Sequence, residues 1–186
     1  MPSSSGGKPS QIYSHEEEYM KTLMLMRHAK SDWKRPGLSD HDRPLNARGR
    51  AAAPFMAKHL AAAQAKADII LASSAVRVQQ TVELMQSQWD QPVEMLTSRE
   101  LYLSSPQQMV DALRELHDAW DSILLIAHNP GLAGLASHWS GGVIEMPTAA
   151  IAVFQFSQST WQTLSLGSEL QLVEYWKPSD LMQASG

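Results

Sequence analysis

The chain has 186 residues, of which 44% are hydrophobic and 18% are charged, and this length and composition fit one globular domain with its own hydrophobic core. Its formal net charge of −4 at pH 7 indicates no nucleic-acid partner, which would need a basic surface, and no apolar stretch approaches the roughly 18–20 residues of a membrane span. The absence of cysteine excludes disulfides, thiolate zinc sites and cysteine nucleophiles, and it is compatible with the cytoplasmic location that we expect.

The first twenty residues differ in composition from the rest of the chain. Residues 1–7 are rich in Ser and Gly, and the polar run Ser14–Glu18 has no apolar period. A basic start followed by an apolar core is missing, so this segment does not resemble a secretory signal. We expect a disordered extension at 1–20, one folded domain at 21–178 and a flexible tail at 179–186.

The first predicted strand is the apolar run Thr22–Met26, which leads into Arg27 and His28. Polar residues and then Pro36-Gly37 end the run, and this favours a short buried strand over a helix. Ligands of open α/β sheets bind outside the carboxyl ends of the strands. Arg27 is a permanent cation and His28 is a nitrogen nucleophile that is neutral near pH 7. This pair suits attack on a phosphoryl group.

Two further predicted strands also end in polar residues that suit such a site. Asp68–Ala72 leads to Arg77, one turn inside the next predicted helix, and Ser122–Ala127 leads directly to His128. Taken singly, Arg77 also fits a solvated helix-face arginine, and His128 also fits a capping or core histidine. Two histidines and two arginines at three strand ends together indicate one site.

Strand-like and helix-like segments alternate along the rest of the chain. This alternation predicts a single α/β domain with a central, mostly parallel sheet and helices on both faces. Asn46 is a good N-cap for the first helix, whereas Pro54 in its middle predicts a kink or a break. The last two strands are expected to form an antiparallel hairpin. The expected helices are 46–66, 75–88, 106–120 and 131–139, and the remaining strands are 92–96, 149–156 and 169–175.

The four residues at the strand ends can be given roles in phosphoryl transfer. His28 is the candidate nucleophile, because it follows an arginine that can bind the same phosphate. Arg27 and Arg77 offer planar guanidinium groups that match phosphate oxygens bidentately. His128, if protonated, would donate to an oxygen that gains charge in the transition state.

Three other residues are weaker candidates for the same site. Glu100 follows the predicted strand 92–96 and is the candidate general acid, since a nearby dianion favours the neutral form of a carboxyl group. Its alternative is a surface glutamate paired with Arg99. Arg43 and Asn46 lie where a loop folds back toward the first strand. They either contact phosphate or serve in a salt bridge and a helix cap.

The sequence predicts no metal and no cofactor. Asp40, His41 and Asp42 are adjacent in the chain and cannot all face one ion, and no histidine pair has the spacing of a zinc site. The glycines between 131 and 142 do not form a phosphate-binding loop of a known type.

These residues resemble the histidine phosphatase (phosphoglycerate-mutase-like) superfamily. Leu25–Ala29 is similar to its Arg-His-Gly signature, and Pro44–Gly49 is similar to its Leu-Thr-x-x-Gly segment. Ser73–Thr81 resembles its second arginine motif and Ala127–Asn129 its second histidine motif. The motifs occur in the expected order within residues 21–176. Ala29 replaces the usual Gly and Asn46 replaces Thr, and neither change removes a charge or the nucleophile.

The segments Arg27–Trp33 and Asp40–Asn46 look most like the small SixA-type phosphohistidine phosphatases of bacteria. The resemblance implies a phosphohistidine intermediate on His28, a phosphate pocket made by Arg27, Arg77 and His128, and no metal cofactor.

The substrate class is predicted from the room available around the site. Only about ten residues join the first strand region to each neighbouring helix, which leaves little material for a lid over a small substrate. An open site favours phosphate presented on a macromolecule, such as phosphohistidine on a signalling protein. The alternatives are a phosphomonoesterase or mutase acting on a small phosphorylated metabolite, and a non-catalytic module that binds phosphorylated partners.

Overall fold

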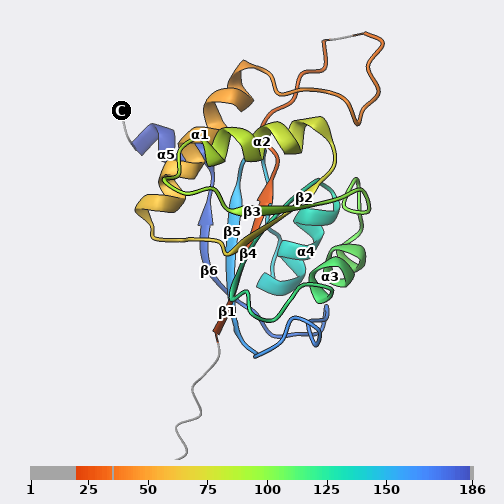
Figure 1. Ribbon diagram of the computed structural model, residues 1–186, viewed down its shortest axis with the longest axis vertical. Coiled ribbons are helices and arrows are strands. Elements are labelled where there is room, and N and C mark those ends of the chain that lie inside the picture. The colour runs from red at the N-terminus through yellow and green to blue at the C-terminus, as the bar shows by residue number, and fades with distance from the viewer. Residues whose placement is uncertain (1–19, 35, 185–186) are drawn as a thin grey trace, which may run out of the picture.

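The computed structural model describes residues 20–34 and 36–184, so the extension expected at 1–20 lies outside the described residues except for Met20. This part of the chain forms five helices and six strands, which alternate as far as β5 (Figure 1). In chain order they are β1 (Met20–Arg27), α1 (Ala47–Ala62), β2 (Ile69–Ser73), α2 (Val76–Gln86), β3 (Glu94–Ser98), α3 (Pro106–Arg114), β4 (Ser122–Ala127), α4 (Gly131–Ser140), β5 (Ile151–Ser157), β6 (Gln171–Trp176) and α5 (Pro178–Ala184).

The strands form a single mixed sheet in the order β3-β2-β4-β1-β5-β6. The pairs β2–β3, β2–β4 and β1–β4 are parallel, whereas β1–β5 and β5–β6 are antiparallel. The predicted mostly parallel sheet and the predicted C-terminal hairpin are therefore confirmed.

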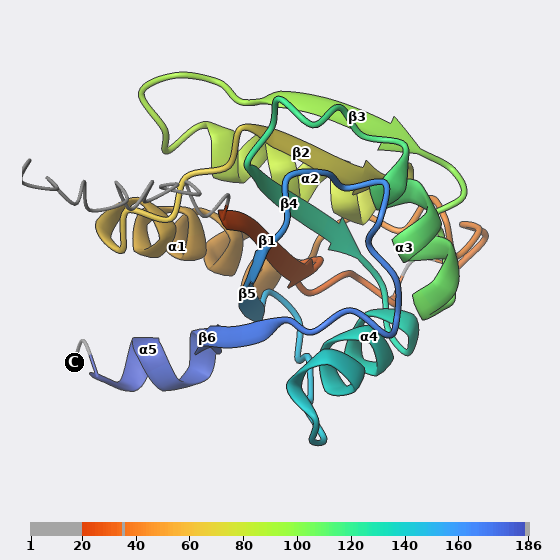
Figure 2. The ribbon, with the colours of Figure 1, turned by 90° about the horizontal axis from the view of Figure 1, so that it is seen from below.

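Helices cover both faces of the sheet, as predicted (Figure 2). Helices α3 and α4 pack on one face, and α1 and α2 pack on the other. Successive strand residues point to opposite faces, so Leu23 and Leu25 of β1 join the first layer while Met24 and Met26 join the second. Burial on both faces explains why β1 is a continuous apolar run.

Three details differ from the predicted elements. Helix α1 continues through Pro54 without a break, because Met56 and Leu60 beyond it remain packed against the sheet. Helix α3 ends at Arg114 rather than at residue 120, and the carbonyls of Asp118 and Trp120 instead accept hydrogen bonds from Lys21. A helix, α5, occupies 178–184, where a loose tail was expected. No helix of the described residues is long and apolar enough to cross a membrane.

Candidate active site

The register of the central strands brings His28 and His128 together. Arg27 is paired with Ala127 in the parallel β1–β4 ladder, so the next residue of each strand is one of the two histidines. Their ring centroids lie 5.1 Å apart. Both side chains are buried, at the carboxyl edge of the sheet where the sequence placed them.

The contacts of His28 fix which ring nitrogen carries its proton. Nδ1 lies 2.7 Å from the carbonyl oxygen of Ala29, which can only accept, so Nδ1 must donate. Nε2 then carries the lone pair, and it accepts a hydrogen bond from Nε of Arg77 at 3.3 Å. Burial, helped by the nearby positive groups, lowers the pKa of His28 to about 3. The ring is therefore neutral at pH 7, with Nε2 in the state that a nucleophile needs.

His128 has the opposite tautomer. Its Nδ1 accepts from Nη2 of Arg77 at 3.2 Å, so Nε2 carries the proton and donates to Oγ of Ser73 at 2.8 Å. Burial, followed by the charge of Arg77, lowers the pKa of His128 to about 3. His128 is thus neutral in this arrangement, whereas the donor role predicted from the sequence needs a protonated ring.

Arg77 is held in place by Asp40, to which no role in the site was assigned from the sequence. Nη1 of Arg77 donates to the Asp40 main-chain oxygen at 2.5 Å, and Nη2 donates to Oδ2 at 3.0 Å. The same carboxylate accepts from Tyr102 at 2.6 Å and from Arg43 at 2.9 Å. Burial alone would raise the pKa of Asp40, but the Tyr102 hydrogen bond and the two arginines outweigh it and lower this pKa to about 2.

Asp40, Tyr102 and Ser73 are site residues that sequence reasoning did not select. Asp40 precedes Arg43 by three residues, so opposite charges at this spacing were an available signal. Ser73 lies inside the quoted second arginine motif. Tyr102 follows the edge strand β3, and its ring lies 5.4 Å from that of His128. Nothing in the sequence points to Tyr102.

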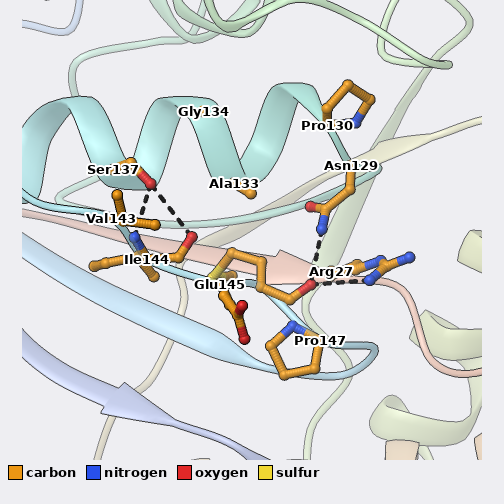
Figure 3. Close-up of a pocket in the computed structure, with 11 residues that line it drawn as sticks. Arg27, Asn129, Pro130, Ala133, Gly134, Ser137, Val143, Ile144, Glu145 and Pro147 are labelled. Carbon is orange, nitrogen blue, oxygen red and sulfur yellow. Dashed lines mark hydrogen bonds between the residues drawn. The ribbon is translucent and has the colours of Figure 1, made fainter.

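Arg27 forms the opposite side of the site. Its Nη1 donates to the carbonyl oxygen of Met146 at 3.0 Å, and the same oxygen accepts from Nδ2 of Asn129 at 2.9 Å (Figure 3). Burial lowers the pKa of the Arg27 guanidinium, and repulsion from Arg77 lowers it further. Two arginines near two neutral histidines, with Arg77 in contact with both rings, make a site that favours an anion.

Arg43 and Asn46 have structural contacts in this arrangement. Arg43 donates to Oγ of Ser31 at 2.9 Å, pairs with Asp40 and stacks at 3.5 Å over the ring of Trp33. Asn46 caps α1, and its side chain accepts from the Gly49 amide at 3.0 Å. Gly49 allows the main chain of Lys30 to lie close to α1, because a Cβ at this position would lie 2.2 Å from the Lys30 oxygen.

The structure does not bring Glu100 into contact with the other site residues. Glu100 is exposed in the turn after β3, and β2 and β4 separate that strand from β1. Its carboxylate makes no hydrogen bond to any described residue, and only its amide is bonded, to Oγ of Ser98.

No group of three or more His, Cys, Asp or Glu within residues 20–34 and 36–184 is arranged to hold a metal ion. The chemistry available at the site is therefore that of a neutral imidazole nucleophile, two guanidinium groups and a second imidazole.

Known proteins share both the sequence pattern and the fold. A family model described as the histidine phosphatase superfamily (branch 1) matches residues 23–101. An uncharacterised protein of Mycobacterium tuberculosis is 32% identical over 141 residues, which cover 70% of this chain and 86% of that protein. An uncharacterised chloroplastic protein of Arabidopsis thaliana is 30% identical over 151 residues, which cover 76% of this chain and 69% of that protein.

Two solved structures have the same arrangement of elements. SixA from Agrobacterium tumefaciens gives a TM-score of 0.72 at 25% identity and covers 85% of this chain and 98% of that chain. The protein histidine phosphatase SixA complexed with tungstate gives a TM-score of 0.72 at 22% identity and covers 86% of this chain and 99% of that chain.

Proposed function

Because the chain belongs to the histidine phosphatase superfamily, we propose that it is a phosphatase that acts through a phosphohistidine intermediate on His28, with protein phosphohistidine as its substrate. One observation carries the proposal: the lone pair of His28 Nε2 is held within a cluster of Arg77 and His128, with Arg27 as the preceding residue.

In the first step, Nε2 of His28 attacks phosphorus while the bond from phosphorus to the leaving nitrogen or oxygen breaks. Arg27 and Arg77 would bind the non-bridging oxygens, where charge accumulates in the transition state. The proton of His28 stays on Nδ1, where it is donated to the Ala29 carbonyl, so the phosphorylated ring is a cationic phosphoimidazole whose charge that carbonyl stabilises. The leaving atom takes a proton from solvent or from an acid.

In the second step, water attacks the phosphoimidazole and the bond between phosphorus and Nε2 breaks. Inorganic phosphate leaves, and His28 returns to its neutral state. A bound phosphate dianion raises the pKa of a neighbouring imidazole, which would allow His128 to take up a proton on Nδ1 and donate it to a phosphate oxygen.

Two features favour phosphohistidine over a small phosphate ester. Among the described residues, Glu100 is exposed and does not contact the site, and the lowered pKa of Asp40 keeps that carboxyl group ionised, so neither is placed to protonate a leaving group. A P–N bond is labile enough to break without such an acid. SixA, which shares the fold, has been solved with tungstate, a tetrahedral oxyanion like phosphate, and is named a protein histidine phosphatase. The cytoplasmic location stays a prediction from the sequence.

Trapping of the intermediate tests the proposal. The protein is mixed with radiolabelled phosphoramidate or a phosphohistidine peptide and is quenched in alkaline detergent. We expect a protein-bound label that is stable in alkali and labile in acid, and we expect no label on the His28→Ala variant. A variant that keeps a tenth of the activity would place the nucleophile elsewhere.

Substrate comparison separates the alternative functions. A phosphohistidine peptide should have a higher kcat/KM than 3-phosphoglycerate or a sugar phosphate, and EDTA should change neither value. Faster turnover of the small esters would identify a phosphomonoesterase. Tight binding of the peptide without release of phosphate would identify a binding module.

A further inference from the structure

A groove of about 600 Å³ runs beside α4, outside the cluster of His28, Arg77 and His128 (Figure 3). Helix α4 forms one wall, and the segment 143–147 that leads to β5 forms the other. Arg27 and Pro147 lie at one end, and Val143 lies at the other. The lining residues are Arg27, Asn129, Pro130, Ala133, Gly134, Ser137, Val143, Ile144, Glu145, Met146 and Pro147.

The groove is continuous with the proposed phosphate site. Arg27 lines the groove, and its Nη1 and the Asn129 amide meet at the carbonyl of Met146, at the groove's near end. A phosphate bound by Arg27 therefore places the group that carries it beside this end. The volume lies in the range of about 300–1,000 Å³ that is typical of ligand sites.

The walls of the groove are fixed before any ligand binds. Oγ of Ser137 on α4 accepts from the amide of Ile144 at 2.8 Å and donates to its carbonyl at 3.3 Å. The carbonyl of Glu145 accepts from the Tyr175 hydroxyl of β6. A ligand thus meets a preformed surface and pays little to order it.

The chemistry of the lining fits a polypeptide. Val143 is 94% exposed, so its side chain is free to contact an apolar residue. Glu145 is the one acidic residue of the lining, and its exposed carboxylate points away from α4 at the outer rim (Figure 3). That carboxylate attracts a lysine or an arginine and repels a second phosphate group.

Two buried polar atoms at the near end also favour a polypeptide over a simple alkyl phosphate. Nε of Arg27 is a donor and Oδ1 of Asn129 is an acceptor, and neither has a hydrogen-bond partner among the described residues. A peptide group carries one acceptor and one donor, which are the complements of these two atoms. An alkyl chain carries neither.

We infer that the groove beside α4 binds the polypeptide segment next to the phosphorylated residue, an inference that rests on the proposed function. Val143 contacts an apolar side chain of that segment, and Glu145 pairs with a basic one. The groove is thereby a specificity site that shares Arg27 with the phosphate site and is otherwise lined by residues that do not act on phosphate.

A panel of short synthetic peptides with a central phosphohistidine tests the inference. The parent peptide has alanine at every other position, and single Leu, Lys or Glu replacements are placed at each position on both sides. We expect Leu at one position to raise kcat/KM about three- to tenfold, and Lys nearby to raise it about two- to fivefold. Phosphoramidate is too small to reach the groove and serves as the reference substrate.

Two exposed variants connect these preferences to the groove. Val143→Ser should remove the preference for Leu in the peptide. Glu145→Lys should replace the preference for Lys with a preference for Glu. Both variants should hydrolyse phosphoramidate within about twofold of wild type. Met182→Ser on α5 and Glu83→Lys on α2 change matched exposed residues on the opposite face of the sheet and should alter neither preference.

The outcomes separate failure of this inference from failure of the proposed function. If the wild-type enzyme turns over phosphohistidine peptides and phosphoramidate but Val143→Ser and Glu145→Lys leave every preference unchanged, the groove is not the peptide site. If Val143→Ser slows a series of alkyl phosphates and leaves the peptides unaffected, the groove binds an alkyl group instead. If neither phosphoramidate nor any peptide is hydrolysed, the proposed function itself is wrong.

Discussion

Lys21 and Arg77 are buried cations at opposite ends of the sheet, and they differ in the acceptors of their hydrogen bonds. Lys21 lies near the start of β1 and Arg77 lies beside the carboxyl edge, and each side chain is only 2% exposed. Lys21 donates to three oxygens, those of Asp118 at 2.6 Å, Trp120 at 3.0 Å and the Asp121 carboxylate at 2.9 Å. Arg77 directs two of its donors at imidazole nitrogens, at 3.3 and 3.2 Å.

This difference teaches how to distinguish a structural cation from one that can bind a ligand. An ammonium group has three donors, so Lys21 has none left for a ligand. The imidazole contacts of Arg77 are long and join it to neutral groups, so phosphate oxygens would replace them favourably. Burial and charge are the same at both ends, and only the partners differ.

The largest effect should come from Arg77→Ala. We expect kcat/KM for phosphoramidate to fall about 10²–10³-fold, because the variant loses a charge-assisted contact worth roughly 2–4 kcal/mol in the transition state. Arg77→Lys should recover little, since an ammonium lacks the guanidinium fork. Circular dichroism checks that both variants fold. Near-wild-type rates in Arg77→Ala would show that Arg77, like Lys21, is a structural cation.

Lys21→Met should show the reverse pattern. The free energy of unfolding should fall by about 1–3 kcal/mol, because two carbonyl groups lose their donor, while kcat/KM stays within about twofold. Urea denaturation and phosphoramidate kinetics on the same preparation measure both quantities. A loss of activity in a folded Lys21→Met variant would show that the two ends of the sheet are coupled.

Acid should lower the stability of the folded protein through the two histidines at the carboxyl edge of the sheet. The pKa values of His28 and His128 are lowered from 6.5 to about 3, so below pH 6.5 the unfolded chain binds protons that the folded protein does not. The contribution of these two histidines to the free energy of unfolding should reach its full value above pH 6.5. It should fall with acidification between pH 6.5 and about 3, by up to about 1.4 kcal/mol per pH unit for each histidine.

Urea denaturation at several pH values between 6.5 and 4 measures this slope before most carboxylates titrate. His128→Asn should reduce the slope, whereas Lys21→Met should lower stability equally at every pH. An unchanged slope in His128→Asn would show that this histidine titrates normally in the folded protein.

The smallest effect is expected from Glu100→Gln. Hydrolysis of phosphoramidate should stay within about twofold, because solvent can protonate the leaving nitrogen. A loss of about 10²–10⁴-fold confined to alkyl phosphates would establish the general-acid role that the sequence predicts. Equal kinetics on both substrates would assign Glu100 to the solvent-exposed surface.

The parts of the site that could be predicted from sequence are those set by strand ends. Arg27, His28 and His128 follow apolar runs, and the sheet order brings β1 and β4 side by side. Glu100 also follows a strand, but that strand lies at the sheet edge and leaves Glu100 exposed, so its role stays a prediction. Position along a strand is visible in a sequence, whereas strand order across the sheet is decided by tertiary packing.

The contact between Asp40 and Tyr102 could not be predicted for a related reason. They are 62 residues apart, and their hydrogen bond exists only because the loop after β1 and the loop after β3 converge over Arg77. Likewise, the continuation of α1 through Pro54 is decided by the side chains that pack on the sheet and not by local propensity.

The hydrogen bond from Nε of Arg77 occupies the lone pair of His28 Nε2 in the resting protein. Under the proposed function, this bond protects the nucleophile, and we expect acylating or alkylating reagents to modify His28 slowly. A bound phosphate would compete for the same guanidinium and free the imidazole for attack. The substrate would then unmask the group that reacts with it, and reactivity at His28 would be confined to the moments when a phosphate is bound.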